Sequence, residues 1–204
     1  PLSLYGQMNK VSRDLNEGHA GEVFIDSLAS TFDRLKDSVI NDAVGMLIDP
    51  KAHIYVVGGR FSSALGVYFA THLQMLRAGI TSVSELPIQR TNALLEMKRH
   101  DVLVALDFRR YQRDTIDLGR AAAENGVRVI LITDTWLSPL VSDSRLVMSI
   151  DTTSPSPFDS FVSALGVLEL LISRLAESIG EESLERMRAH DALNQSLMME
   201  EHQS

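Results

Sequence analysis

The chain has 204 residues, of which 45% are hydrophobic and 23% are charged, and its net charge is −8. This length and composition predict one sizeable hydrophobic core in a single domain that carries additional helices. The negative charge opposes non-specific binding to nucleic acid. Cysteine is absent, which excludes disulfide bonds and thiol catalysis and is consistent with a reducing cytoplasm.

The sequence contains no recognisable membrane or export signal. No apolar run approaches the roughly 20 residues that a membrane-spanning helix requires, and residues 1–10 lack the charged-then-apolar layout of a signal peptide. We therefore expect a cytoplasmic protein with no membrane partner. Because the first residue is Pro1, we expect either a processed chain or a piece of a longer one.

Two helical regions are predicted before the first strand. The first has four apolar residues at helical spacing: Leu4, Met8, Val11 and Leu15. The pattern breaks over residues 16–21. A second apolar stripe then runs from Phe24 to Leu47 and stops at Pro50, which predicts a further helical region.

Strands and helices alternate in the central part of the chain. Short apolar, β-branched runs predict strands at His53–Val57, Thr81–Ser84, Val102–Leu106, Val127–Thr133 and Leu146–Ile150. Helical patterns lie between them at Ser63–Arg77, Gln89–Lys98 and Thr115–Asn125. This alternation implies right-handed crossovers, and the fold class we predict is α/β, with a doubly wound, five-stranded parallel sheet flanked by helices.

Glycines mark several of the predicted helix ends. Gly79 and Gly126 lie where C-terminal caps are expected. A long helix is predicted from Phe158 to Ser178 and ends at Gly180. A last helix begins at Glu181 and is expected to fray after about Met198.

The segment HIYVVGGRFSS, residues 53–63, has the pattern of an anion-binding turn. An apolar strand leads into Gly58 and Gly59, and the following hydroxyls of Ser62 and Ser63 stand at a predicted helix start. Glycine allows close approach of a ligand to the backbone, and a helix N-terminus attracts negative charge. The other reading is a plain strand-to-helix turn in which these serines cap the helix.

Ligands of doubly wound sheets bind beyond the carboxyl ends of the strands. This rule selects the loops that follow the predicted strands: residues 58–63, 84–89, 107–114 and 134–141. A fifth loop, Asp151–Asp159, is rich in Ser, Thr and Pro and can close over the same region.

The order of these motifs resembles a known family. IYVVGGRFSS, DVLVALDFRRYQRDT, ENGVRVILITD, SPL and FDSFVSALGVLELL follow one another as in the SIS (sugar isomerase) domain, and most resemble the effector domain of RpiR/MurR-type transcriptional regulators. The resemblance covers roughly residues 21–178. It implies that residues 1–20 are a linker or helix following a helix-turn-helix domain absent from this chain, and that 21–204 form the effector-binding domain.

The chain departs from the family pattern at the positions that hold a sugar phosphate. Gly58 and Ser62 match the ends of the G-x-G-x-S turn, but the middle glycine is Arg60. The positions of the second motif, S-x-S-G-x-T, carry charged or amide side chains instead: Asp107, Arg109, Arg110 and Gln112. We expect Arg60, Ser62, Arg109 and Arg110 to line one anion-accepting pocket.

The remaining predicted ligand contacts are open to two readings. Asp107 with Arg109 or Arg110 is either an internal ion pair or a ligand contact. Asp159 and Ser160 open the predicted long helix, so capping alone explains them, whereas the matching turn in SIS domains also lines the ligand pocket. Asp134 is read as structural. Trp136 either covers the pocket or packs against its neighbours.

Three functions remain possible. We favour a sensor domain that binds a small anionic effector such as a sugar phosphate, forms a homo-oligomer, and contacts DNA only through the absent domain. A sugar-phosphate isomerase is the first alternative, with Glu85 as the only plausible base. A dimerisation module with a decayed pocket is the second. The six histidines show neither metal-ligand spacing nor a nucleophile–base pair, so we expect no metal, cofactor or catalytic residue.

Overall fold

A computed structural model describes residues 19–201 of the chain. Its centre is a five-stranded, entirely parallel sheet with the strand order β2-β1-β3-β4-β5. The strands are β1 (Ile54–Gly58), β2 (Ile80–Val83), β3 (Val102–Leu106), β4 (Arg128–Asp134) and β5 (Leu146–Ile150). The predicted doubly wound fold is therefore confirmed, and the predicted strand limits are correct to within one residue.

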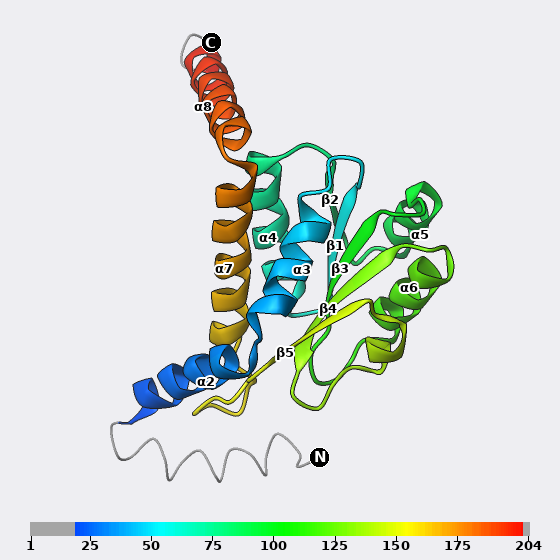
Figure 1. Ribbon diagram of the computed structural model, residues 1–204, viewed down its shortest axis with the longest axis vertical. Coiled ribbons are helices and arrows are strands. Elements are labelled where there is room, and N and C mark those ends of the chain that lie inside the picture. The colour runs from blue at the N-terminus through cyan, green and yellow to red at the C-terminus, as the bar shows by residue number, and fades with distance from the viewer. Residues whose placement is uncertain (1–18, 202–204) are drawn as a thin grey trace.

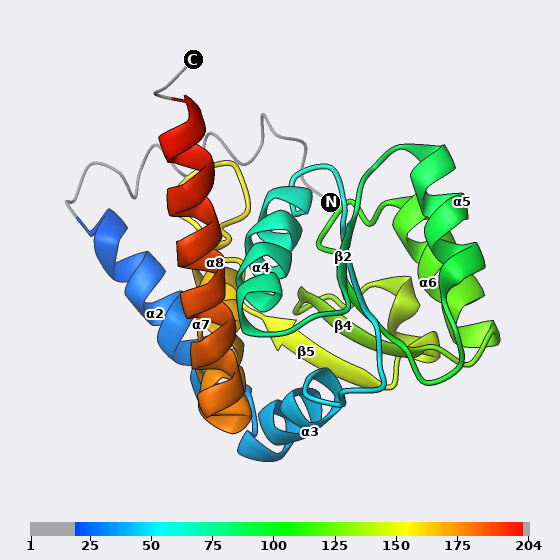
Figure 2. The ribbon, with the colours of Figure 1, turned by 90° about the horizontal axis from the view of Figure 1, so that it is seen from above.

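Helices cover both faces of the sheet (Figures 1 and 2). One layer contains α2 (Ala20–Arg34), α3 (Asp37–Leu47), α4 (Ser63–Leu76) and α7 (Val162–Ile179). The other contains α5 (Pro87–Glu96), α6 (Arg113–Glu124) and the short 3-10 helix η2 (Pro139–Asp143). This arrangement agrees with the near-continuous apolar runs of the strands, because each strand must bury both faces.

The sheet separates two hydrophobic cores. Along β3, Val102, Val104 and Leu106 point into the core beneath α3, α4 and α7, whereas Leu103 and Ala105 point into the core beneath α5 and α6. All five residues of β1 and of β3 are buried. These two central strands are thereby held rigidly, and their carboxyl ends provide a fixed platform.

The predicted single helical stripe from Phe24 to Leu47 is broken in the structure. Helix α2 ends at Arg34, and Leu35 and Lys36 are extended before α3 begins. The break redirects the chain, so that α2 packs on α7 while α3 inserts Ile40, Ala43, Val44 and Leu47 into the core. A straight helix could not serve both surfaces.

The last two helices also differ from the prediction. Helix α7 begins at Val162 rather than Phe158, because the preceding residues form part of a loop described below. Gly180 has φ +66° and separates α7 from α8 (Glu181–Glu201), which remains helical beyond the expected fraying point. Figure 1 shows α8 extending past the body of the domain, at the end opposite α2.

The first predicted helical region lies outside the residues that the structure describes. Leu4, Met8, Val11 and Leu15 precede the described residues, as does the predicted 1–20 linker apart from its last two residues. Within residues 19–201, no helix combines the length and the apolar character that crossing a membrane requires.

Candidate functional site

The strand order reverses direction between β1 and β3. These strands are neighbours in the sheet although α4, β2 and α5 lie between them in the sequence. Beyond their carboxyl ends is a cavity of about 380 Å³, which we call the switch-point cavity. Three loops supply its lining: Gly59–Ser62 after β1, Asp107–Gln112 after β3, and Pro157–Phe161 before α7.

The turn after β1 is held tightly against the start of α4. A Cβ added to Gly58 would lie 2.5 Å from the backbone of Ser62 and Ser63, so only glycine fits there. Gly59 lies beside the Gln112 side chain, and its Cβ would be 3.4 Å from that side chain. The Ser62 hydroxyl accepts from the Gly59 N–H at 2.9 Å and donates to the Leu106 carbonyl at 2.7 Å. Ser62 thus joins the ends of β1 and β3.

Ser63 lies at the first residue of α4 and outside the cavity lining. Its hydroxyl donates only a long hydrogen bond, 3.4 Å, to the Arg60 carbonyl. Arg60 itself is exposed, lines the cavity and packs over Phe61 with 5.7 Å between the guanidinium carbon and the ring centre.

Asp107 is almost completely buried, with 1% of its surface exposed. Its carboxylate accepts from the Gln112 N–H at 3.1 Å, at the start of α6, and from the Ser138 hydroxyl at 2.5 Å. Burial raises the pKa of Asp107, and these two hydrogen bonds partly offset that rise. The structure therefore pairs Asp107 with α6 and η2, and not with Arg109 or Arg110 as one reading proposed.

Arg109 is paired across the cavity with Asp159. Its guanidinium donates to the two carboxylate oxygens of Asp159 at 2.5 and 3.3 Å. The guanidinium also lies over the Trp136 ring, 5.0 Å from the ring centre. Both side chains of the ion pair are mostly shielded from solvent. This pair attaches the loop before α7 to the loop after β3.

Asp134 at the end of β4 holds the Arg109 loop in place. Its buried carboxylate accepts from the Arg109 N–H, from the Tyr111 hydroxyl at 2.7 Å and from the Trp136 N–H at 2.9 Å. Burial, followed by the hydrogen bond to Asp134, raises the pKa of Tyr111. This geometry agrees with the prediction that Asp134 is structural. Trp136 packs against Arg109, which lines the cavity.

Arg60 and Arg110 are the cations of the cavity that take part in no salt bridge within residues 19–201. Both are exposed cavity-lining residues, and Arg110 has φ +79°. The four residues expected to share one cavity, Arg60, Ser62, Arg109 and Arg110, all line it. Gln112 lines it as well.

The loop before α7 connects the cavity to α2. At one end are Asp159, which pairs with Arg109, and Ser160, whose hydroxyl accepts from the Val162 N–H at 3.2 Å. At the other end, Asp151 is bound by three side chains of α2. Its carbonyl accepts from Ser27 at 2.9 Å, its N–H donates to Thr31 at 3.0 Å, and its carboxylate accepts from Arg34 at 3.1 Å. Ser160 thus bonds the first N–H of α7 from the position before the N-cap residue Phe161, and it does not line the cavity.

The apolar part of the site was not predicted. Four aromatic side chains line the cavity: Phe61, Phe108, Phe158 and Phe161. Phe108 and Phe161 pack with 5.1 Å between their ring centres, while Phe61 and Phe158 are 63% and 66% exposed. Each of these phenylalanines is adjacent in the sequence to a polar residue that we predicted as a ligand contact. Their position in the loops that follow the strands was therefore the signal that could have identified them.

A buried arginine behind the site was also missed. Arg90 of α5 donates to the Gly58 carbonyl at 3.2 Å, the Ser84 carbonyl at 3.3 Å and the Thr115 hydroxyl at 3.2 Å, and pairs with Asp114 at 3.1 Å. It fixes the ends of β1 and β2 to the start of α6. The sequence places Arg90 only inside a predicted helix, with no sign of these partners.

A family model for the SIS domain matches residues 46–174, which is more than half of the chain. The chain belongs to the SIS domain family. The match contains β1 to β5 and most of α7. It therefore includes all three cavity loops and the strands β1, β3 and β5 that precede them. A comparison with curated proteins gives no match.

Solved structures with the same fold include both regulators and isomerases. The SIS domain described here is 27% identical to the sugar isomerase domain of an RpiR transcription factor from Sphaerobacter thermophilus, with a TM-score of 0.80 over 85% of this chain and 97% of that one. The NanR protein of Vibrio vulnificus complexed with ManNAc-6P is 19% identical, with a TM-score of 0.73 over 91% and 73% of the two chains. Phosphoheptose isomerase of Neisseria gonorrhoeae is 14% identical, with a TM-score of 0.64 over 82% and 97%.

Proposed function

We propose that this SIS domain is the non-catalytic effector-binding part of an RpiR-type transcriptional regulator, and that the switch-point cavity binds an anionic sugar metabolite such as a sugar phosphate. The observation that carries this proposal is that Arg60 and Arg110, which take part in no salt bridge within residues 19–201, line a cavity that is also lined by four aromatic side chains. A phosphate or carboxylate satisfies the cations, and the aromatic walls suit the apolar faces of a sugar.

The similarity to a regulator over nearly the full length of its sugar isomerase domain supports the regulatory assignment. The structure of NanR in complex with ManNAc-6P supports the ligand class. In the full regulator, DNA contact belongs to a helix-turn-helix domain ahead of the SIS domain.

The carboxylates of the cavity argue for a sensor rather than an isomerase. Asp107 is bound by Ser138 and by the start of α6, and Asp159 is bound by Arg109. Glu85, the base considered for an isomerase, is exposed after β2 and does not line the cavity. Proton transfer between adjacent carbons needs a base within hydrogen-bond reach of the substrate.

The loop before α7 provides a route from effector to DNA-binding domain. An anion that reaches Arg109 competes with Asp159, and the far end of the same loop is bound to α2 through Asp151. A change in this loop therefore alters the support of α2, the first helix of the described residues 19–201. Such a coupling is typically worth about 1–3 kcal/mol, enough to change operator occupancy severalfold.

The test is a thermal-shift screen of ManNAc-6P and other monosaccharide phosphates, with inorganic phosphate and unphosphorylated sugars alongside. A phosphorylated sugar is expected to raise the Tm, because a ligand that binds only the folded state stabilises it. Replacing Arg60 and Arg110 together by Gln is expected to weaken binding by about 3 kcal/mol, roughly a hundredfold in Kd. Arg109 is retained so that Asp159 keeps its partner.

Arg113→Gln is the matched control. Arg113 is the first residue of α6, is almost fully exposed and, among the described residues, forms its salt bridge with Asp117, outside the cavity. Its variant should bind as the parent does. If Arg113→Gln weakens binding as much as the double variant does, or if the double variant binds as tightly as the parent, the cavity assignment is contradicted. Formation of an isomerised sugar phosphate, followed by NMR, would instead identify an enzyme.

A further inference from the structure

The charged side chains that line the switch-point cavity differ in their exposure according to their sign. Asp107 lines the cavity at the end of β3 and is almost completely buried. Arg60 and Arg110 line the same cavity but are exposed to solvent. The field inside the cavity therefore has a direction: negative charge lies at the strand ends, and positive charge lies toward the solvent.

The Asp107 carboxylate lies at the amino-terminal end of α6. Gln112 is the N-cap residue of this 12-residue helix, and its side chain makes no capping hydrogen bond. The Gln112 N–H instead donates to Oδ1 of Asp107 at 3.1 Å. A helix N-terminus attracts negative charge, which an anionic ligand or a carboxylate of the chain can supply. Here Asp107 supplies it.

The other carboxylate oxygen of Asp107 is bound by Ser138. The Ser138 hydroxyl donates to Oδ2 of Asp107 at 2.5 Å and accepts from the Leu140 N–H at 3.2 Å. An amide N–H and a hydroxyl are donors that a phosphate oxygen also accepts. Without Asp107, the Gln112 N–H and the Ser138 hydroxyl would face the cavity as free donors. The chain has therefore placed its own anion where a ligand anion would otherwise find donors.

Further negative charge lies close to Asp107. Burial raises the pKa of Asp107, the hydrogen bonds from Ser138 and Gln112 lower it, and the nearby charges of Asp134 and Asp114 raise it. The nearest guanidinium of the same loop, Arg109, is bound to Asp159. An anionic group of a ligand that reached the end of β3 would meet the same repulsion.

We infer that Asp107 is a specificity-determining residue of the switch-point cavity, because it occupies the anion position at the start of α6 and excludes the effector's anionic group from the strand ends. Arg60 and Arg110 then hold that group on the solvent side. The uncharged part of the effector lies inward, against Phe108 and Phe161, which line the cavity and pack on each other. This inference rests on the function proposed above, since it concerns the same cavity.

The experiment is a ³¹P NMR titration of the full chain with inorganic phosphate. Asp107→Ser removes the carboxylate and leaves the Gln112 N–H and the Ser138 hydroxyl available. This variant is expected to bind phosphate at least about tenfold more tightly than the parent, which corresponds to one charge-assisted hydrogen bond. The gain should persist when Arg60 and Arg110 are also replaced by Gln, because the new contacts lie at the start of α6.

Asp107→Asn separates the charge of the side chain from the space it fills. The amide is neutral but has the same size and still accepts from Gln112. Phosphate affinity is expected to rise only about threefold, through the loss of repulsion, and this smaller gain should disappear in the Arg60 and Arg110 double variant. Asp117→Asn is the matched control. Asp117 is an exposed residue of α6 outside the cavity, so its variant should bind phosphate as the parent does.

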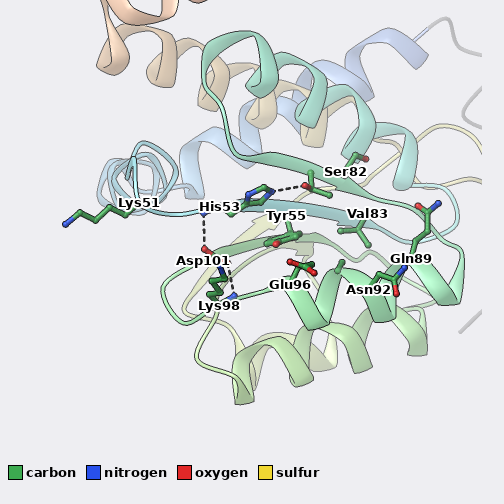
Figure 3. A pocket seen from close by; sticks show the side chains of 12 residues that line it. Lys51, His53, Tyr55, Ser82, Val83, Gln89, Asn92, Glu96, Lys98 and Asp101 are labelled. Atoms are coloured by element: carbon green, nitrogen blue, oxygen red, sulfur yellow. Dashed lines mark hydrogen bonds between the residues drawn. The ribbon is translucent and has the colours of Figure 1, made fainter.

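A second control concerns lysines elsewhere on the surface. Lys51 and Lys98 line a separate pocket of about 640 Å³ between β2 and α5, which shares no residue with the switch-point cavity (Figure 3). Inorganic phosphate is attracted to such side chains. Replacing both lysines by Gln in the Asp107→Ser variant should leave the gain intact.

Thermal melting verifies that each variant folds before it is titrated. A gain in Asp107→Ser that survives replacement of the arginines and of the lysines supports the inference. Absence of a gain overturns it, as does a gain that either replacement removes. If Asp107→Ser does not fold, Asp107→Asn decides, and an affinity equal to that of the parent overturns the inference.

The outcome is separable from that of the proposed function. If no sugar phosphate binds the parent, the proposed function is contradicted, but the phosphate titration of the Asp107 variants still decides whether Asp107 excludes an anion. If sugar phosphates bind the parent and Asp107→Ser gains no affinity for phosphate, only the inference about Asp107 is contradicted.

Discussion

Ser62 shows at the scale of one residue how a hydroxyl chosen as a ligand contact can also be structural. It accepts from the Gly59 N–H and donates to the Leu106 carbonyl, so both of its strong hydrogen bonds are made within the protein. Ser63, one position later, has only the long contact with Arg60. The two adjacent serines therefore contribute differently to stability.

We predict that Ser62→Ala lowers the free energy of unfolding by about 1–3 kcal/mol, because it leaves a buried N–H and a buried carbonyl without their partner. Ser63→Ala should change it by less than about 0.5 kcal/mol. Urea denaturation of the two variants measures both values. Equal destabilisation by the two substitutions would contradict the bridging role of Ser62.

At the scale of elements, the junction of β1 and α4 depends on close backbone contact. Gly58 ends β1, and a Cβ there would lie 2.5 Å from backbone atoms that cannot move independently of α4. Gly45, by contrast, lies inside α3 with no atom within 4 Å of an added Cβ. The same substitution at these two glycines should therefore have opposite signs.

We predict that Gly58→Ala destabilises the protein by about 1–3 kcal/mol through overpacking, and that Gly45→Ala stabilises it by about 0.5–1 kcal/mol through helix propensity. Chemical denaturation measures the change in the free energy of unfolding, and hence its sign, for both variants. A neutral Gly58→Ala variant would mean that α4 can shift away from β1 without cost.

The contact between the cavity loop and α2 should depend on pH. Burial raises the pKa of Asp151, but the Thr153 hydroxyl and N–H, together with Arg34, outweigh it and leave the pKa lowered. A lowered folded-state pKa contributes stability above the unfolded-state value of 3.8 that is lost as pH falls through the folded-state pKa.

Asp151→Asn should therefore lower the free energy of unfolding by about 1 kcal/mol at pH 7, the upper range for a partly exposed ion pair. The parent and variant curves should converge below pH 3.8. Asp26→Asn, on the exposed side of α2, is the control and should change stability by less than about 0.5 kcal/mol at pH 7. A difference between parent and Asp151→Asn that persists in acid would rule out the carboxylate as its cause.

At the scale of the whole molecule, one helical layer exposes more apolar surface than the sheet requires. Val67 of α4 is 54% exposed, Leu165 of α7 is 37% exposed, and Ile25 of α2 is 67% exposed. Helices α2 and α4 both pack on α7, so these side chains belong to one layer. Apolar patches of this kind commonly mark an interface between subunits.

We predict that the protein sediments as a homo-oligomer, at least a dimer of the 22.6 kDa chain, at micromolar concentration. Replacing Val67 and Leu165 together by Glu should shift it toward the monomer, because charge is costly in a buried interface. Leu95→Glu on the opposite helical layer should have no such effect. A monomeric parent, or dissociation caused by Leu95→Glu, would contradict this interface.

The sequence alone determined the parallel sheet, the loops that form the site and the family. Those features follow from local patterns: β-branched runs give strands, glycines end helices, and parallel strands bring their carboxyl ends to one edge. The break between α2 and α3 was missed because the apolar stripe continues across it, and only packing on two different surfaces required it.

Only the tertiary structure decided which side chains of the site are free. The sequence left Asp107 open either to an ion pair with Arg109 or Arg110 or to a ligand contact. In the structure Asp107 is bound by Ser138, and Arg109 pairs with Asp159. A side chain's partner is set by the three-dimensional distances between elements, and a linear pattern contains no such distances.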